Sequence, residues 1–225
     1  MRHQIKLGAY GWRHRHWATT FYPEDLPADA DEDWRLSYYS NQFNTVIVPY
    51  SYWLADDAID CETWRDDVHD GFSFIVECHP QMFERISATE FTRCLTKLRA
   101  RLSALVLFEN TPLEPELVQL IDSLMHSLGV DVFSAYEIFD AALQEKVHAI
   151  WMPGKPQKST LAYIENDLSD LRLAGAIAET FVASLVVRDD AGETDTRQVS
   201  MIVDHPRLQA EDLLRFRSVL DIAGY

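Results

Sequence analysis

Short apolar runs alternate with longer amphipathic stretches along almost the whole chain. Most of these runs end at a glycine, a proline or a group of polar residues, which is typical of strands that are buried on both faces of a sheet. The runs predict eight strands, at residues 5–10, 45–48, 72–78, 104–108, 130–135, 147–152, 181–187 and 199–203.

The stretches between the runs show helical spacing and recognisable helix ends. Ser87 and Glu90 have the spacing of a capping box, and an apolar stripe that begins at Phe91 follows them. Another helix begins near Pro115 and stops at Gly129. Further helices are expected at residues 33–43, 56–68, 139–146, 161–173 and 210–220.

The repeated order of strand and helix predicts an α/β fold with a parallel sheet. A doubly wound open sheet gives the same local pattern, but eight strands in 225 residues favour a TIM (β/α)₈-type barrel. No linker divides the chain, so we expect a single domain over residues 1–225. Residues 188–198 are too few for a parallel crossover, so the barrel is expected to be irregular or incomplete near its last two strands.

The first third of the chain carries aromatic and turn residues in a recognisable order. They are Gly8-Ala9-Tyr10-Gly11-Trp12, Trp17, Phe21-Tyr22-Pro23, Leu26-Pro27, Trp34, Tyr38-Tyr39, Phe43-Asn44-Thr45-Val46, Trp64 and Gly71-Phe72-Ser73-Phe74. Over about residues 5–76 this order resembles the YecE-like family, which is domain of unknown function 72. The resemblance implies a barrel similar to the TIM barrels of the xylose-isomerase and endonuclease type, and it implies no particular reaction.

The chain departs from the family pattern at two expected strand ends. Glu77 stands where the family has a lysine. Where the family places a glutamate followed by Asn-Ser or Asn-Thr, this chain has Ile47, Pro49, Tyr50 and Ser51. The charge at the expected pocket is therefore altered, and the ligand is expected to differ from that of ordinary members.

The composition limits the partners and the compartment. With 36 acidic and 20 basic residues, the formal net charge is −16, which argues against broad binding of nucleic acid or of an anionic membrane. No apolar stretch is long enough to span a bilayer, and no targeting signal is recognisable, so we expect a cytoplasmic protein. Cys61, Cys78 and Cys94 are odd in number and are expected to be free thiols in a reducing compartment. Nothing in the sequence indicates the oligomeric state.

Titratable residues gather where the predicted strands end. Glu77 and His79 follow the third strand, Glu109 follows the fourth and Asp204 follows the last. In a barrel these ends meet at one face, so Glu77 or Glu109 is a candidate general base and His79 a candidate acid or ligand. The same residues can supply ligands to a divalent metal cofactor, although their spacing is not diagnostic and polar residues resume at most strand ends.

The segment Arg13-His14-Arg15-His16 is the densest cationic group in the chain. It follows the first predicted strand and lies between Trp12 and Trp17, so we expect it to hold a small anionic or sugar-like ligand, with the two indoles as stacking surfaces. Tyr52 can line the same pocket or pack under the loop. The alternative is a solvated loop whose arginines pair with the acidic residues 24–33.

These observations leave three functions open. The first is binding of a small anionic or sugar-like ligand at the carboxyl end of the barrel. The second is a metal-dependent hydrolase or isomerase at the same place, and the third is a catalytically inactive interaction protein. Motifs for classical nucleotide binding and for covalent serine hydrolysis are not found in the sequence.

Overall fold

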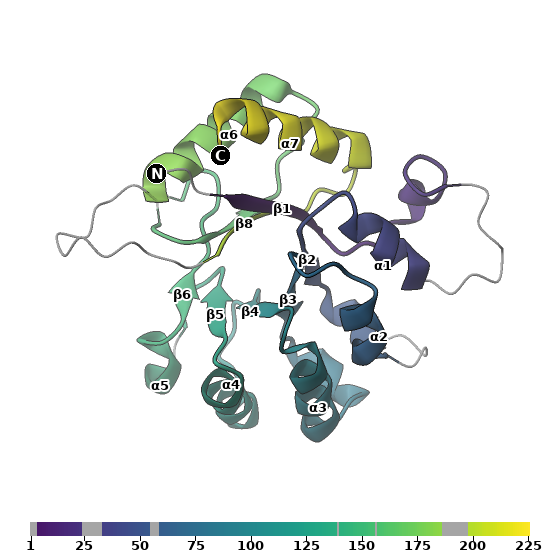
Figure 1. Ribbon diagram of the computed structural model, residues 1–225. Coiled ribbons are helices and arrows are strands. Elements are labelled where there is room, and N and C mark those ends of the chain that lie inside the picture. Colours follow the sequence, from purple (N-terminus) through teal and green to yellow (C-terminus); the bar gives the residue numbers. More distant parts are fainter. Residues whose placement is uncertain (1–3, 24–32, 55–58, 139, 156, 186–197) are drawn as a thin grey trace.

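The computed structural model describes residues 4–23, 33–54, 59–138, 140–155, 157–185 and 198–225. In these residues eight parallel strands curl around a common axis, and the helices lie outside them (Figure 1). The strands are β1 (Ile5–Tyr10), β2 (Thr45–Val48), β3 (Ser73–Glu77), β4 (Leu102–Leu107), β5 (Asp131–Ser134), β6 (His148–Ala149), β7 (Leu161–Ile164) and β8 (Val199–Val203).

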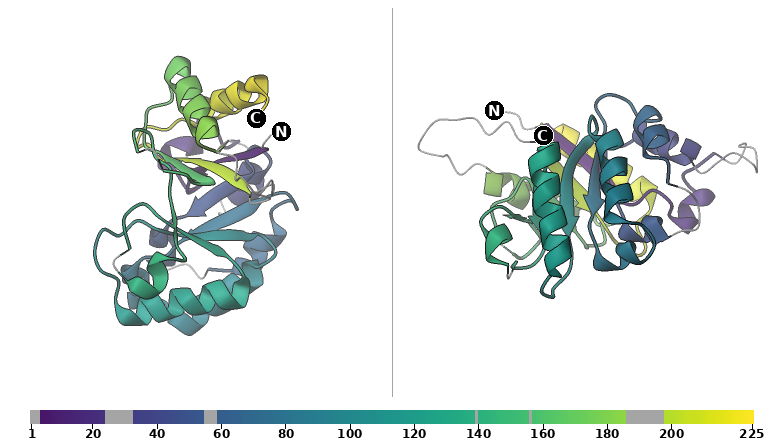
Figure 2. Two further views of the ribbon diagram at one scale, coloured as in Figure 1. Left: turned by 90° about the vertical axis from the view of Figure 1, so that its left-hand side faces the viewer. Right: turned by 90° about the horizontal axis from the view of Figure 1, so that it is seen from below.

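The helices form the outer layer of the barrel. They are α1 (Asp33–Ser40), α2 (Cys61–Asp66), α3 (Ala88–Leu98), α4 (Pro115–Leu128), α5 (Ala141–Gln144), α6 (Leu171–Leu185) and α7 (Ala210–Ala223). Figure 2 shows α6 and α7 packed side by side on one side of the sheet, with α3 and α4 on the opposite side. Among the described residues, every helix is too short or too polar to cross a membrane.

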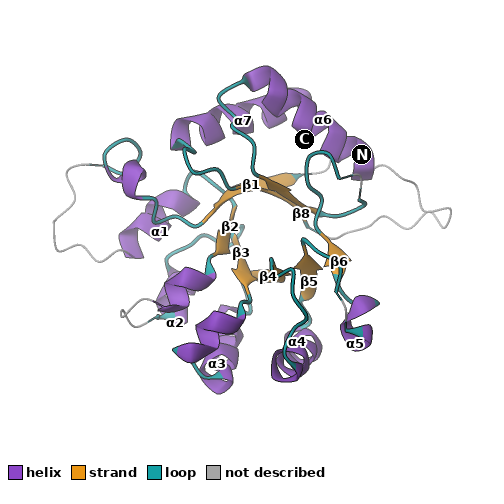
Figure 3. Ribbon diagram, turned by 180° about the vertical axis from the view of Figure 1, so that it is seen from behind, coloured by secondary structure: helices purple, strands orange, loops and turns teal. Residues whose placement is uncertain are grey.

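The sheet runs in the order β6-β5-β4-β3-β2-β1-β8-β7, and all neighbouring strands are parallel (Figure 3). No ladder joins the described strands β6 and β7, so the curled sheet has an open edge there. A single bridge between Trp151 and Ala162 crosses this edge. The predicted TIM-type α/β fold is confirmed, and its irregularity involves β7, one of the last two strands.

Two predicted elements in the second half of the chain are wrong. The helix predicted at residues 161–173 is β7, the turn that follows it and the first residues of α6. The strand predicted at residues 181–187 is helical over residues 181–185, which end α6, and residues 186–187 lie outside the described residues. A four-residue apolar run such as β7 carries too little periodicity to separate strand from helix. Asp170, whose side chain accepts a hydrogen bond from the Arg172 N–H at 2.8 Å, marks where α6 begins.

The open edge therefore has a different cause from the one expected. The connection from β7 to β8 contains α6, so it is an ordinary helical crossover, and residues 188–197 lie outside the described residues. The short connection is instead the one from β6 to β7. It contains no described helix and turns back at once, with the Lys155 N–H donating to the Met152 carbonyl at 2.9 Å. So short a link limits the pairing of two parallel strands.

Alternation along the strands divides the core into an interior cluster and an outer cluster. The outer cluster lies between strands and helices and contains most of the buried aromatic side chains. The interior cluster consists of Ile47, Ile75, Ala104, Val106, Phe133, Ile150, Leu161, Tyr163 and Ile202. Because side chains two residues apart share a face, a residue two positions beyond an interior residue also points into the barrel.

The expectation of three free thiols is wrong. Cys61 in α2 and Cys94 in α3 form a disulfide, and only Cys78 is free and buried. Nothing in the sequence indicates this pairing, because the two cysteines are 33 residues apart and meet only when neighbouring helices pack together. The cysteines therefore no longer support the expectation of a reducing compartment.

Candidate functional site

Polar side chains meet at the carboxyl end of the barrel interior. Glu77, Tyr163 and Asp204 each stand two residues beyond a member of the interior cluster, and Tyr10 and Phe108 pack against that cluster. These five residues come from β1, β3, the end of β4, β7 and the end of β8. We call Tyr10, Glu77, Phe108, Tyr163 and Asp204 the mouth cluster.

Glu77 is a buried acid that is held by two hydrogen bonds. It is 3% exposed, and its Oε2 accepts from the Tyr10 hydroxyl at 2.5 Å and from the Tyr50 backbone N–H at 2.8 Å. Burial raises the pKa of the Glu77 carboxyl above its usual range, although the two hydrogen bonds act in the opposite direction. Among the described residues, no lysine or arginine forms an ion pair with it.

Asp204 forms the second pair of the mouth cluster, in which its Oδ2 accepts a hydrogen bond from the Tyr163 hydroxyl. Burial raises the pKa of Asp204 as well. Burial and the neighbouring carboxylates raise the pKa values of Tyr10 and Tyr163, so both phenols stay protonated at neutral pH. The two phenol rings meet edge to face at 6.3 Å, and the Phe108 ring lies 6.2 Å from one and 4.6 Å from the other. The two tyrosine–carboxylate pairs thus form one connected cluster.

His79 and Glu109 lie beside the mouth cluster and pair with each other. The Nδ1 of His79 accepts from the Gln81 N–H at 3.1 Å, which leaves Nε2 to donate to Oε1 of Glu109. The imidazole also stacks on Tyr50, with ring centroids 4.0 Å apart, and Tyr50 in turn donates its N–H to Glu77. The structure therefore brings the three predicted catalytic residues together, but both nitrogens of His79 are occupied. His79 therefore holds the Glu109 carboxylate through Nε2 in this arrangement.

The loop after β1 packs into the outer layer. Trp12 and Trp17 are 1% and 0% exposed, so protein covers the indole faces on which a ligand was expected to stack. The Nε1 of Trp17 donates to the Leu208 carbonyl at 2.8 Å, and Nε2 of His16 lies 2.6 Å from the same oxygen. These contacts hold the loop against the turn that precedes α7.

The expected anion clamp lacks the charge of one member, His14. Burial lowers the pKa of His14 to about 4, so its imidazole, packed 4.2 Å from the Trp17 ring, is neutral at pH 7. The guanidinium of Arg13 lies 4.8 Å from the centre of the Tyr52 ring. The Tyr52 hydroxyl accepts the backbone N–H groups of Trp12 and Arg13, at 3.0 and 2.8 Å. Tyr52 therefore stabilises the conformation of this loop.

A cavity of about 310 Å³ lies among the end of β5, the segment that follows it, α5 and β6. Tyr136, Glu137 and Gln144 are among the residues that line it. Ala135, which also lines it, packs against the interior cluster together with Phe108. The five residues of the mouth cluster are not among those that line the cavity, so it is a separate feature on the β5–β6 side of the barrel.

The acidic and histidine side chains at this end do not surround a common point. Within the described ranges of the chain, no group of three or more His, Cys, Asp or Glu side chains is arranged to hold a metal ion. Glu77 and Asp204 pair with tyrosines, whereas His79 and Glu109 pair with each other. The proposed ligand set for a divalent metal is thus not assembled in this arrangement.

Three residues of this region, Tyr10, Phe108 and Tyr163, were not predicted as site residues from the sequence. Tyr10 is the last residue of β1, and alternation from its interior neighbours is the signal that places it. Tyr163 was missed because the sequence predicts a helix, rather than a strand, at residues 161–173. Phe108 carries only the general tendency of aromatic residues to pack in cores, which does not distinguish a site from a core position.

The fold is similar to that of two crystal structures of a DUF72 family protein from Enterococcus faecalis V583. One has a TM-score of 0.54 at 10% sequence identity and covers 97% of this chain and 98% of its own. The other has a TM-score of 0.53 at 12% identity and covers 96% and 95%. At these identities the likeness concerns the fold alone.

Sequence comparison with family models extends the resemblance beyond the aromatic opening. No curated protein matches the chain. The model described as "Protein of unknown function DUF72" matches residues 6–174, which is well over half of the chain and includes β1 to β7. It thus reaches past the aromatic residues of the first third and into α6. The chain therefore belongs to the DUF72 family.

Proposed function

We propose that this protein binds a small, uncharged, hydroxyl-rich ligand such as a sugar at the carboxyl end of its barrel. One observation carries the proposal: the pairs Tyr10–Glu77 and Tyr163–Asp204 lie against each other inside the barrel. Carboxylates accept hydrogen bonds, and phenol hydroxyls both donate and accept them. Sugar hydroxyls also donate and accept, so they can join both pairs without leaving a buried polar group unpaired.

The charge of the region favours an uncharged ligand over an anionic one. Glu77, Glu109 and Asp204 place three carboxyl groups at one end of the barrel. An anionic ligand near them meets repulsion that the protein interior screens less than water does. The guanidinium of Arg13 is stacked on Tyr52 in the outer layer, away from the barrel interior.

The apolar surfaces suit the same class of ligand. Binding pockets are lined mainly by apolar and aromatic groups, with a few polar groups that fix the orientation of the ligand. Phe108 is half-buried within the mouth cluster, so it supplies apolar surface beside the two tyrosine–carboxylate pairs.

Calorimetric titration with unphosphorylated sugars and polyols, and with sugar phosphates, tests the proposal. At least one unphosphorylated sugar should bind more tightly than its phosphate. The variants Glu77→Gln and Tyr163→Phe should weaken that binding about tenfold or more, because each removes hydrogen-bonding capacity at the site. Glu116→Gln on the exposed surface of α4 is the matched control and should bind like the unaltered protein.

Tighter binding of the phosphates, or unchanged affinity in both mouth-cluster variants, overturns the proposal. Absence of binding to the whole panel also overturns it and favours the interaction protein. In that case the mouth cluster would serve only to stabilise the barrel.

Acid–base catalysis on the bound ligand is a second candidate, and Glu77 is the residue that favours it. A general acid or base works best when its pKa lies near the operating pH, and burial moves the Glu77 pKa in that direction. A sugar isomerase or a hydrolase can use such a group. If this activity exists, Glu77→Gln should abolish turnover while Glu109→Gln, which disturbs only the neighbouring pair, should retain part of it.

A further inference from the structure

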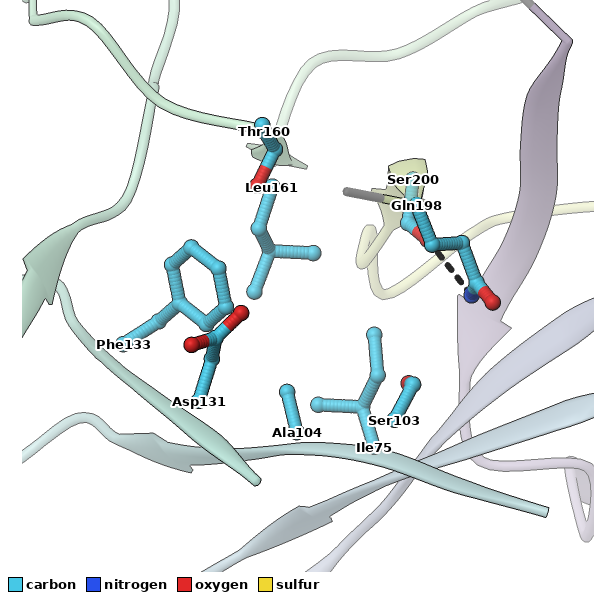
Figure 4. Close-up of a pocket in the computed structure, with 9 residues that line it drawn as sticks. All are labelled: Ile75, Ser103, Ala104, Asp131, Phe133, Thr160, Leu161, Gln198 and Ser200. Carbon is cyan, nitrogen blue, oxygen red and sulfur yellow. Dashed lines mark hydrogen bonds between the residues drawn. The ribbon is translucent and has the colours of Figure 1, made fainter. Parts of the chain in front are cut away.

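A second cavity lies at the opposite, amino end of the barrel (Figure 4). Its volume is about 60 Å³, and its walls come from the first residues of β4, β5, β7 and β8. Barrel interiors are usually filled by layers of bulky branched side chains. Here Ala104 and Ser200 occupy interior positions, and the cavity is the space that larger side chains would fill. One water molecule needs about 10–15 Å³, so this cavity has room for a molecule of several atoms.

The lining of this cavity offers acceptors over an apolar floor. Leu161 and Phe133 form part of the floor, and Figure 4 shows the Asp131 carboxylate beside the Phe133 ring. The hydroxyl of Ser103 donates to the Phe74 carbonyl at 3.0 Å, so it has only lone pairs left to offer.

The one amide donor in the lining is already engaged. Nε2 of Gln198 lies 2.7 Å from the Ser73 hydroxyl and 3.4 Å from the Ser200 hydroxyl, so its N–H groups are directed at these two oxygens. The Thr160 and Ser200 hydroxyls can donate as well as accept, so the lining can accept hydrogen bonds from a ligand that brings its own donors. Its single charge, that of Asp131, is negative.

We propose that this cavity binds a small ammonium ion, either ammonium itself or a primary ammonium ion such as methylammonium. The N–H groups donate to Asp131 and to the hydroxyl oxygens, the charge pairs with the Asp131 carboxylate, and the Phe133 face adds a cation–π contact. A methyl group rests on Leu161 and the other apolar side chains of the floor. Nε2 of His148 lies 3.6 Å from Oδ1 of Asp131, so a protonated imidazole competes with the ligand. The site lies at the other end of the barrel from the proposed sugar site and does not depend on it.

Thermal denaturation and ligand-detected NMR with methylammonium chloride at pH 8 test this site, with sodium chloride and tetramethylammonium chloride at equal ionic strength as salt controls. The unaltered protein should show a methylammonium-specific rise in Tm and saturation transfer to the methyl protons. Asp131→Asn should weaken binding about tenfold or more, because it removes the charge. Ala104→Val should fill the cavity and abolish binding. Asp122→Asn, which removes a carboxylate paired with Lys146 on the outside of the barrel, should bind normally.

Equal responses to methylammonium and to the control salts overturn the proposal, as does unchanged binding in both Asp131→Asn and Ala104→Val. Absence of any saturation transfer in the unaltered protein also overturns it and leaves water as the content of the cavity. The NMR measurement compares each folded variant with its own baseline, so a loss of stability in Ala104→Val does not imitate a loss of binding.

Discussion

At the scale of single residues, the barrel holds an acid and a base that burial drives toward their neutral forms. Glu77 is an acid whose pKa is raised, and His14 is a base whose pKa is lowered to about 4. In both cases loss of water is the largest cause, since a charge is less stable in a medium that polarises little. The two residues therefore make the stability of the fold depend on pH in opposite directions.

Glu77→Gln should increase the free energy of unfolding at neutral pH. The folded state holds the Glu77 proton more tightly than the unfolded state, so the stability this group contributes is greatest at low pH. It is lost as pH rises from the usual value of 4.5 through the raised pKa. Urea unfolding at pH 4 and pH 7.5 should show the advantage of the variant growing with pH. A variant that is equally or less stable at pH 7.5 would contradict the assigned burial.

His14 should make the protein lose stability in mild acid. The pKa of His14 is about 4 in the folded state and 6.5, the usual histidine value, in the unfolded state. As pH falls from 6.5 to 4, the unfolded state therefore takes up a proton before the folded state does. The expected loss is about 3 kcal/mol between pH 7 and pH 4, at 1.36 kcal/mol for each pH unit of the shift. Denaturant unfolding should show a smaller loss in His14→Phe and an unchanged one in His126→Gln, on exposed α4. An NMR titration of His14 with a midpoint near 6.5 would refute the prediction.

At the scale of elements, the outer layer is held together by a covalent link as well as by packing. The disulfide between Cys61 and Cys94 joins α2 to α3, and these two helices also pack closely along their length. Trp64 of α2 contacts Trp12 and Trp53, which belong to the loops after β1 and β2. The link therefore fixes the helices that support two of the loops at the carboxyl end.

Reduction of this disulfide should lower the free energy of unfolding by about 3 to 4 kcal/mol. The closed loop spans 33 residues, and opening it restores conformational freedom to the unfolded chain. Urea unfolding with and without reductant measures the effect, and the double variant Cys61→Ala with Cys94→Ala should not respond to reductant. Detection of three reactive thiols in the denatured but unreduced protein would show that the link does not form.

The sequence predicted element boundaries well where a particular residue marks the end of an element. The strands at residues 5–10, 45–48 and 199–203 agree with β1, β2 and β8, because apolar runs there stop at Gly11, Pro49 and Asp204. The capping box of Ser87 and Glu90 is also present, with each side chain bonded to the other's backbone N–H. The four residues of β7 fit the period of a strand and that of a helix equally well, so the prediction assigned them to a helix. The only local signal that separates β7 from α6 is Asp170, just before α6 begins.

The candidate site was predictable in position but not in its pairing. Glu77 and Asp204 follow from alternation along single strands, which is a local property. Their tyrosine partners lie 67 and 41 residues away in the sequence, and those contacts exist only once the sheet has curled. The roles expected for Trp12 and Trp17 depended on exposure, which a sequence does not record and which the outer helices remove.

At the scale of the whole molecule, the barrel keeps its two proposed sites apart. Three carboxyl groups and two phenols gather at the carboxyl end, whereas one carboxylate and a ring of hydroxyls line the amino end. The interior cluster fills the barrel between them. The chain has a net charge of −16, and acidic side chains lie at both ends of the barrel, where they disfavour anionic ligands.

The central claim is that the mouth cluster binds hydroxyl-rich ligands, and a crystal structure with the tightest-binding sugar of the panel tests it most directly. The account predicts that sugar hydroxyls lie within hydrogen-bonding distance of both Glu77 and Asp204, with a ring face or a methylene edge against Phe108. A sugar that binds elsewhere, with Glu77 and Asp204 bonded only to Tyr10, Tyr50 and Tyr163 as they are now, would contradict it.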